Sequence, residues 1–216
     1  MTTNRSLTIG RIILLVLVSS RMTNVALALN ILIPGGTGNF GKVLIPKLAD
    51  HDVTVLSRNA FLASAPNRVT GEFGFLGEQF LESNKHVKMR DWDGGDLLDI
   101  VGQDWVGWQE DTLKKADVVI NLVGGYTEQR LMATERIVRE SLRVNPSALQ
   151  VCVSPMESEM QYLSPGMLKL KAKRIDACES MVLNNCENCA NLRLEANALG
   201  AMSDVIIRAI KSETSE

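Results

Sequence analysis

Residues 30–41 read NILIPGGTGNFG, and this stretch decides the fold. It begins with a continuous apolar run at 30–34, which is typical of a short β-strand buried on both faces. Glycines follow the run at once, and residues 40–50 then have apolar side chains at helical spacing. A buried strand, a glycine-rich turn and a helix in this order predict the first unit of a parallel sheet. The inward residues of that helix are expected to be Val43, Leu44 and Leu48.

The same alternation of strands and helices continues along the chain. We expect further strands at 53–56, 86–89, 117–123, 149–153 and 191–194. We expect helical stretches within 97–115 and at 127–144, 168–183 and 203–210. Strands that alternate with helices imply parallel βαβ units. The predicted fold is therefore of the α/β class, a doubly wound parallel sheet in a single Rossmann-fold domain.

Two segments carry further expectations about the core. The helix at 127–144 is amphipathic, and its predicted inward side chains are Leu131, Ile137, Val138 and Leu142. The irregular segment 60–84 is expected to fold its phenylalanines back onto the core, namely Phe61, Phe73, Phe75 and Phe80.

Composition excludes several classes of protein. The chain has 216 residues, of which 45% are hydrophobic and 22% charged, an ordinary globular balance. Its 23 Lys and Arg against 25 Asp and Glu give a net charge of −2, which argues against a broad nucleic-acid-binding surface. No apolar run reaches the roughly 18 residues that a membrane-spanning helix needs. We therefore expect no nucleic-acid partner and no transmembrane segment.

The first 28 residues differ from the rest and are interpreted as a targeting or signal segment, with residues 29–216 forming the domain. No acidic residue precedes Asp50, an apolar run occupies 12–18, and residues 26–28 read Ala-Leu-Ala. A secretory signal and an organelle transit peptide both fit, so a plastid, a mitochondrion or the secretory pathway is expected. The alternatives are an additional N-terminal helix or an incorrect start codon, in which case the protein would be cytoplasmic.

The chain has four cysteines, and two of them, Cys186 and Cys189, form a C-x-x-C. Such a pair is either a redox motif or half of a zinc site. No second pair completes a metal set, and the motif follows an expected helix rather than preceding one. We therefore expect structural or incidental thiols and no metal.

The glycines at 35, 38 and 41 form G-x-x-G-x-x-G between the first strand and the first helix. Glycine is needed here for a tight turn, for close approach of the backbone to a pyrophosphate, and for close packing of helix on strand. The helix start also offers free N–H groups to phosphates. The motif predicts a dinucleotide site, and the alternative is a tight turn without a ligand.

The end of the second strand indicates which cofactor binds. An NAD site usually has Asp or Glu there, for the ribose 2′-hydroxyl. This chain has Ser57 and Arg58, which can hold a 2′-phosphate. We expect NADPH in preference to NADH, unless Arg58 is a plain surface charge.

Three segments together resemble the extended and atypical short-chain dehydrogenase/reductases: 31–41 (ILIPGGTGNFG), 53–58 (VTVLSR) and 118–125 (VVINLVGG). More narrowly, the chain is similar to the NAD-dependent epimerase/dehydratase group of Rossmann proteins. Residues 92–94 (Trp-Asp-Gly) and the Asn-Leu-Val-Gly-Gly run resemble its sugar-nucleotide epimerase-like branch. The likeness covers about residues 30–210, and its glycine motif is specific for the superfamily and not for a substrate.

The resemblance implies roles for individual residues. The pyrophosphate would be lined by Gly35, Thr37, Gly38, Asn39, Phe40 and Gly41. Arg58 would take the 2′-phosphate, and Asp91 or Trp92 would lie near the adenine. The adenosine ribose would be flanked by Leu122, Val123 and Gly124. Ser154 corresponds to the catalytic serine near the nicotinamide.

The family's catalytic Tyr-x-x-x-Lys is missing. Tyr162 is followed four positions later by Gly166 rather than by lysine, and Lys169, Lys171 and Lys173 come later. Tyr162 could still reach the site from a loop as the proton donor, with Lys169 or Lys173 as the ribose contact. A packing role is the alternative for Tyr162.

The chain also lacks the C-terminal substrate domain of the extended class, so we do not expect full epimerase activity. The first hypothesis is a single-domain NADPH-dependent oxidoreductase acting on a small carbonyl or related acceptor. The second is a non-catalytic NAD(P)-binding module that acts through a protein partner, in organelle assembly, or as a homodimer.

Core or partner packing is expected for Trp92, Trp105 and Trp108. The basic helix start at 169–174 is interpreted as a solvated face that could bind phosphate or an acidic partner.

Overall fold

The computed structural model describes residues 28–65, 75–94, 107–124, 127–156, 160–195 and 198–213. Their strands form a six-stranded sheet in the order β3-β2-β1-β4-β5-β6, in which every neighbouring pair is parallel. The strands are β1 (Asn30–Pro34), β2 (Asp52–Ser57), β3 (Val87–Asp91), β4 (Val118–Asn121), β5 (Leu149–Pro155) and β6 (Cys189–Leu194). The predicted doubly wound α/β fold is confirmed.

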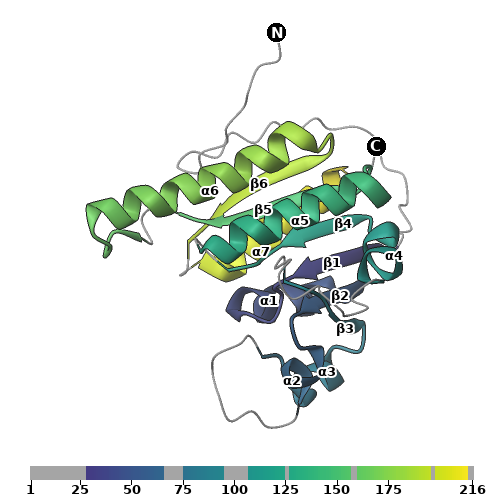
Figure 1. Cartoon of the computed structure of the whole chain (residues 1–216). Coiled ribbons are helices and arrows are strands. Elements are labelled where there is room, and N and C mark those ends of the chain that lie inside the picture. The colour runs from purple at the N-terminus through teal and green to yellow at the C-terminus, as the bar shows by residue number, and fades with distance from the viewer. Residues whose placement is uncertain are drawn as a thin grey trace.

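Helices cover both faces of this sheet (Figure 1). The first face is covered by α1 (Asn39–Leu44), the 3-10 helix η1 (Ile45–Leu48) and α7 (Leu199–Glu213). The second face is covered by α4 (Trp108–Asp111), the 3-10 helix η3 (Leu113–Lys115), α5 (Glu128–Val144) and α6 (Pro165–Asn185). Two short helices, α2 (Ala60–Ser64) and α3 (Glu78–Ser83), lie at the β3 edge.

Alternate residues of each central strand pack into different cores, as the period of two in a strand requires. Ile31 and Ile33 of β1 pack with α1, η1 and α7, whereas Leu32 packs with α4, η3 and α5. Trp92 and Trp108 meet edge to face in this second core, with ring centroids 5.6 Å apart, which confirms their packing role. Trp105 lies outside the described residues.

The first helix is shorter than expected. It ends as an α-helix at Leu44 and continues as η1, which has Pro46 in its first turn. Proline lacks the N–H that an α-helical hydrogen bond would need, so the change to a 3-10 helix has a direct cause. Leu44 and Leu48 are buried as predicted, and Val43 is half-buried.

The expectations for Phe61 and Leu142 are wrong. Phe61 is 78% exposed because α2 has only five residues and buries the side of Ala60 and Ala63 instead. Leu142 is 41% exposed, since Ser141 takes the inward position and accepts a hydrogen bond from Gln150 Nε2 at 2.7 Å.

The other described phenylalanines of the segment 60–84 are at least partly buried, as expected. Phe80 packs against the first core, and Phe75 is half-buried with the Lys42 ammonium 5.9 Å from its ring centroid. Phe73 lies outside the described residues, as do residues 1–27 of the expected targeting segment and residues 95–106 of the expected helical stretch.

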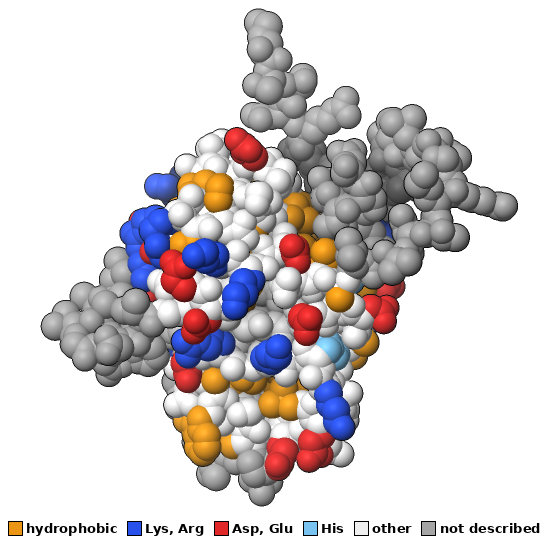
Figure 2. Space-filling view, turned by 90° about the vertical axis from the view of Figure 1, so that its right-hand side faces the viewer, with side chains coloured by type: hydrophobic (Ala, Val, Ile, Leu, Met, Phe, Trp, Pro, Cys, Tyr) orange, Lys and Arg blue, Asp and Glu red, His pale blue; other side chains and the backbone are white. Residues whose placement is uncertain are grey.

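None of the described helices is both long enough and apolar enough to cross a bilayer. On the face shown in Figure 2, Lys and Arg side chains are interspersed with Asp and Glu. This mixture agrees with the small net charge of −2.

Candidate functional site

The glycine-rich turn lies where the strand order reverses, between β1 and its two neighbours β2 and β4. The Gly35 N–H donates to the Leu56 carbonyl at 3.2 Å, and the Leu122 N–H donates to the Pro34 carbonyl at 2.9 Å. The turn is thus tied to the carboxyl ends of both neighbouring strands. In open α/β sheets, ligands bind at such a reversal point.

Gly35 is required by its surroundings. Its φ is +73°, and a Cβ there would lie 2.8 Å from both Val123 Cα and Val123 N. These are backbone atoms of the segment that leaves β4, so they cannot turn aside. The structure therefore brings the backbone of the predicted Leu122 and Val123 directly against the glycine turn.

Gly41 is required still more strongly. A Cβ at this position would lie 1.8 Å from the carbonyl oxygen of Gly36. Helix α1 can pack on the turn only because Gly41 has no side chain, which is one of the roles expected for glycine in this motif.

Gly38 differs from both, because nothing in the described part of the protein requires it to be glycine. Its φ is −78°, which any residue adopts, and the nearest atom to a Cβ would be the Gly35 carbonyl oxygen at 3.9 Å. A side chain at position 38 would extend into open space at the start of α1. We call this open space beside the Gly38 backbone the cradle. A Cβ would narrow it, as expected where a pyrophosphate approaches the backbone.

The other residues predicted to line the pyrophosphate surround this cradle in different ways. Thr37 is buried and its carbonyl oxygen accepts from the Phe75 N–H at 3.1 Å, whereas Asn39 is exposed. Phe40 packs on the first core. Of these three residues, Asn39 is the exposed one at the start of α1, whereas the Phe40 side chain faces the core.

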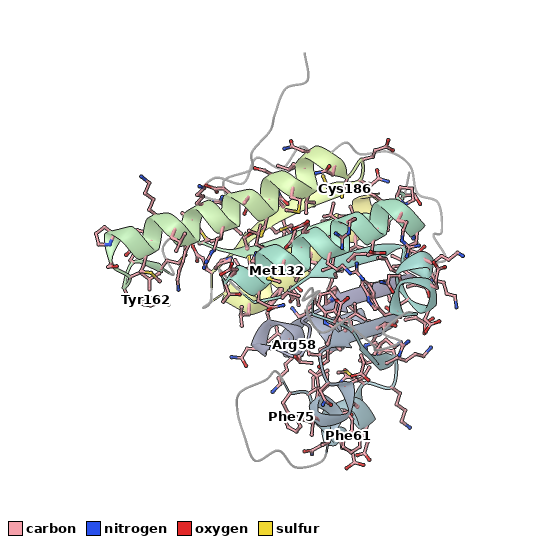
Figure 3. The ribbon with its side chains drawn as sticks, viewed as in Figure 1. Arg58, Phe61, Phe75, Met132, Tyr162 and Cys186 are labelled. Carbon is pink, nitrogen blue, oxygen red and sulfur yellow. The ribbon has the colours of Figure 1, made fainter. Side chains whose placement is uncertain are left out.

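Ser57 is the last residue of β2 and Arg58 follows it, at the same edge of the sheet. Ser57 Oγ accepts from the Asn59 N–H at 3.3 Å, and Asn59 Oδ1 accepts from the Leu62 N–H at 2.8 Å as the N-cap of α2. Arg58 is exposed, and Figure 3 shows it near α1. Its position is compatible with a phosphate contact, which stays a prediction.

Asp91 ends β3, next to β2, and Trp92 follows it. Asp91 is the register partner of Ser57, and its Oδ1 accepts from the Ala60 N–H at 2.6 Å, which helps α2 to begin. The Trp92 side chain is buried against Trp108. Of the two residues predicted near the adenine, Asp91 is the one on the partly accessible side.

Ser154 lies in a buried polar cluster that the sequence did not reveal. Arg130, on the first turn of α5, donates from Nη2 to Ser154 Oγ at 2.8 Å and from Nη1 to the Val153 carbonyl at 2.6 Å. Arg130 and Ser154 are each 1% exposed. A guanidinium only donates, so Ser154 Oγ is the acceptor in this bond and keeps its own proton to donate.

Arg130 has an unusual environment for a buried cation. Its Nη2 also donates to Cys152 Sγ at 3.3 Å, and its Nε has no hydrogen-bond partner among the described residues. Of the ion pairs that the described residues form, none includes Arg130. One signal in the sequence was available, because Arg130 shares the apolar stripe of α5 with Thr134, Ile137 and Ser141.

Tyr162 and the lysines stand apart from this cluster. Tyr162 is 73% exposed, and Figure 3 places it at the tip where α6 begins, at the opposite end of the helix from Cys186. Lys169 and Lys173 are exposed on α6, and Lys171 is half-buried. The structure does not bring Tyr162 and Ser154 together.

All four cysteines lie around one apolar cluster between α6 and the end of the sheet. Burial raises the pKa of the Cys152 thiol to about 11, although the Arg130 cation lowers it in part. Burial also raises the pKa of Cys186 to about 11, helped by Cys189. Within the described part of the chain, no three His, Cys, Asp or Glu side chains could hold a metal ion.

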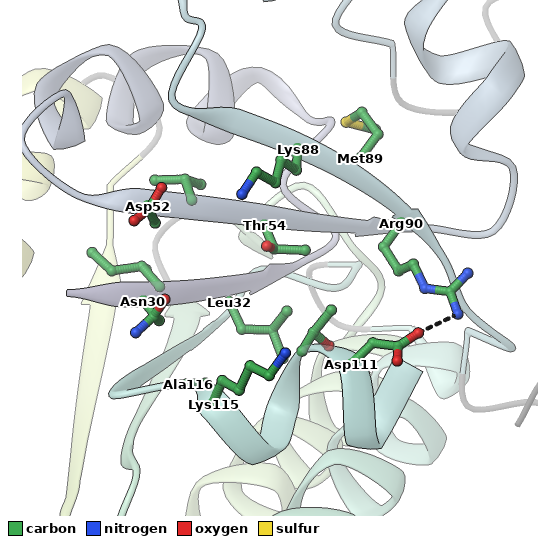
Figure 4. Close-up of a pocket in the computed structure, with 13 residues that line it drawn as sticks. Asn30, Leu32, Asp52, Thr54, Lys88, Met89, Arg90, Asp111, Lys115 and Ala116 are labelled. Carbon is green, nitrogen blue, oxygen red and sulfur yellow. Dashed lines mark hydrogen bonds and ion pairs between the residues drawn. The ribbon is translucent and has the colours of Figure 1, made fainter. Parts of the chain in front are cut away.

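A cavity of about 340 Å³ lies away from the glycine turn. It opens between η3 and the sheet, toward the amino ends of β1 and β2, beside Thr54 and Lys88 (Figure 4). The Arg90–Asp111 ion pair, 2.9 Å long, closes one side. The candidate site at the carboxyl ends is a separate region.

Comparison with known proteins identifies the fold. No protein-family model matches the sequence, and a search of curated proteins finds no similar chain. Among solved structures, the Bordetella bronchiseptica enzyme WbmH in complex with NAD+ is 10% identical, with a TM-score of 0.56 over 85% of this chain and 72% of that one. A Thermus thermophilus protein assigned as a short-chain oxidoreductase is 14% identical, with a TM-score of 0.50 over 83% of this chain and 94% of that one. Together with the strand order, these likenesses show that the chain has a Rossmann-like α/β fold, the fold of these two solved structures.

Proposed function

We propose that the chain binds NADP(H) at the carboxyl ends of β1, β2 and β4 and acts as a single-domain reductase on a small carbonyl compound or related acceptor. The observation that carries the proposal is the open space beside Gly38. Protein atoms explain Gly35 and Gly41, but none of those described lies near enough to explain Gly38. A pyrophosphate against the backbone of the turn would explain it.

The residues present fit such a cofactor. Ser57 ends β2 and Arg58 follows it, and a serine and an arginine at this end of β2 would hold the 2′-phosphate of NADPH. Leu122 and Val123 pass against Gly35, where the adenosine ribose is expected. The preference for NADPH over NADH rests on Arg58, since a guanidinium attracts the additional phosphate.

When bound, the nicotinamide supplies a hydride to the acceptor carbon. The chain would orient the acceptor and stabilise its oxygen, which gains negative charge. Ser154 would donate a hydrogen bond there, since its Oγ accepts from Arg130 and the positive charge of Arg130 favours an oxyanion nearby. This role requires the end of β5 to open, because Ser154 is enclosed. Tyr162 is the candidate proton donor, with Lys169 as ribose contact, and this role requires the segment before α6 to turn inward.

The test is a fluorescence titration of NADPH and NADH into the parent chain and into Gly38→Ala. We expect the variant to bind both nucleotides at least about tenfold more weakly, because the Cβ narrows the cradle. Its free energy of unfolding should stay within about 0.5 kcal/mol of the parent value, since the Cβ meets nothing closer than an ordinary contact.

Gly166→Ala is the matched control, because a Cβ there meets nothing within 4 Å but lies on α6. This control should bind both nucleotides as the parent does. Unchanged binding by Gly38→Ala, or no nucleotide binding by the parent chain, would contradict the proposal.

A second candidate function has its own support. Ser154 is enclosed and Tyr162 points outward, so the groups expected to do chemistry are not assembled. A non-catalytic nucleotide-binding module that acts through a protein partner fits this geometry. It predicts NADPH binding without NADPH oxidation over a panel of carbonyl acceptors. Steady oxidation that falls at least about tenfold in Ser154→Ala would instead favour the enzyme.

A further inference from the structure

At Gly94 the segment that follows β3 meets both Gln129 of α5 and the side chain of Arg58. It follows β3 with φ +67°, and its carbonyl accepts a hydrogen bond from Gln129 Nε2 of α5 at 2.5 Å. A Cβ on Gly94 would lie 2.8 Å from both Cγ and Cδ of Arg58. The aliphatic stem of Arg58 therefore rests directly on the bare backbone of Gly94.

We propose that Gly94 and Gln129 set the cofactor specificity, by forming the platform that holds Arg58 against the 2′-phosphate of NADPH. This inference rests on the proposed NADP(H) site and deepens it. A free arginine side chain loses much rotamer freedom when it is fixed on a ligand. If the stem of the side chain already lies against a rigid surface, part of this rotamer entropy is lost before the ligand binds, and binding itself costs less.

The geometry makes the effect selective for one nucleotide. Any side chain at position 94 must displace the Arg58 stem, because no stem atom can remain 2.8 Å from a Cβ. The displaced group is the far part of a flexible side chain rather than backbone, so the sheet itself need not move. NADH has no 2′-phosphate, and its binding should not depend on where Arg58 lies.

The experiment measures dissociation constants of NADPH and NADH for the parent chain and for Gly94→Asn. Asparagine tolerates positive φ better than other side chains, so the substitution tests displacement of Arg58 rather than backbone strain. We expect NADPH affinity to fall at least about tenfold, since hydrogen bonds to charged groups contribute this much, and NADH affinity to stay within about twofold. Gln129→Met, which removes the bond to the Gly94 carbonyl, should cause a smaller loss in the same direction.

A double-mutant cycle separates positioning from general damage. In the Arg58→Ala background, Gly94→Asn should cause no further change in the ratio of NADPH to NADH affinity. Equal weakening of both nucleotides, or an additional loss in that background, would overturn the inference.

The parent chain distinguishes the two proposals. A parent that binds neither nucleotide overturns the NADP(H) site and this inference with it. A parent that binds NADH as tightly as NADPH overturns only the platform, and the nucleotide site itself stands.

Discussion

Replacing Gly41 with alanine tests whether α1 is held on the glycine turn by direct backbone contact. The new Cβ would lie 1.8 Å from Gly36 O and 2.6 Å from Gly36 C, whereas real Cβ contacts stay beyond 3.0 Å. Helix and turn must therefore separate by about 1.2 Å, because both clashing atoms are backbone and cannot rotate away. At Gly166, by contrast, an added Cβ would meet no atom within 4 Å.

The size of the effect follows from what this separation breaks. It strains two backbone hydrogen bonds, Gly36 N to Ile33 O at 3.2 Å and Lys42 N to Gly38 O at 3.1 Å, each contributing about 1 kcal/mol. It also lifts Leu44 and Ile45 from the core, and overpacking of this kind costs about 1–3 kcal/mol. Alanine in a helix returns about 1 kcal/mol. We expect the free energy of unfolding to fall by about 2–4 kcal/mol.

Urea unfolding followed by circular dichroism measures this change, with the slope m as a check on two-state behaviour. Gly166→Ala, the same substitution in open space near the start of α6, should be neutral or stabilise the protein by up to about 1 kcal/mol. If Gly41→Ala unfolded at the same urea concentration as the parent, α1 would not pack on the turn as described.

Three further predictions address other parts of the molecule. Arg130→Met leaves the buried Val153 carbonyl and Ser154 hydroxyl without their donor, so urea unfolding should show a loss of about 2–4 kcal/mol, and a loss below about 1 kcal/mol would contradict this reasoning. The Cys152 thiol titrates near 9.0 when unfolded and its pKa is about 11 when folded, so the unfolded state loses its proton first as the pH rises. Between these values the contribution of the thiol to the free energy of unfolding should fall by about 1.4 kcal/mol per pH unit. Urea unfolding of the parent and of Cys152→Ala over this pH range should therefore show a decline that is less steep in the variant by about that amount. Phe61→Ser should leave the melting temperature nearly unchanged because the ring is 78% exposed, and a clear drop would show that Phe61 packs after all.

The sheet could be predicted because its signals are local and repeated. β1 and β4 are short runs rich in Val, Ile and Leu that are buried on both faces, and the glycine turn follows β1 at once. Such runs fix the strand type, and alternation with helices fixes parallel pairing. The observed order β3-β2-β1-β4-β5-β6 is that of a doubly wound sheet, and right-handed crossovers leave few alternatives to it.

Short helices are harder to predict than strands. Helix α2 has five residues, barely more than one turn, so a period of 3.6 residues cannot show which side faces inward. The sequence therefore gives no sign that Phe61 faces outward. In α5 the inward line runs through Ile137 and Ser141, and the polar Ser141 conceals it from a search for apolar positions.

The polar cluster around Arg130 could not have been assembled from the sequence. Its acceptors lie on β5, 22 to 24 residues further along the chain. The spacing on α5 shows only that an arginine stands on an inward face. Which groups accept hydrogen bonds from Arg130 depends on how α5 crosses β5, and this is a property of tertiary packing.

The glycine turn shows most clearly what structure adds to a motif. In the sequence, Gly35, Gly38 and Gly41 are equivalent members of one spacing. In the structure, backbone atoms at 2.8 Å or less exclude a side chain at Gly35 and Gly41, so these two would be needed for the fold even without a ligand. Gly38 has ordinary backbone angles and, among the described residues, no neighbour closer than 3.9 Å to a Cβ, so the fold gives no reason for it. Gly166 on α6 is equally open, so an open position alone does not indicate a ligand. Gly38 differs because it lies in the turn at the carboxyl ends of β1, β2 and β4, where a pyrophosphate would explain it, and the proposed nucleotide site therefore rests on Gly38 in this place.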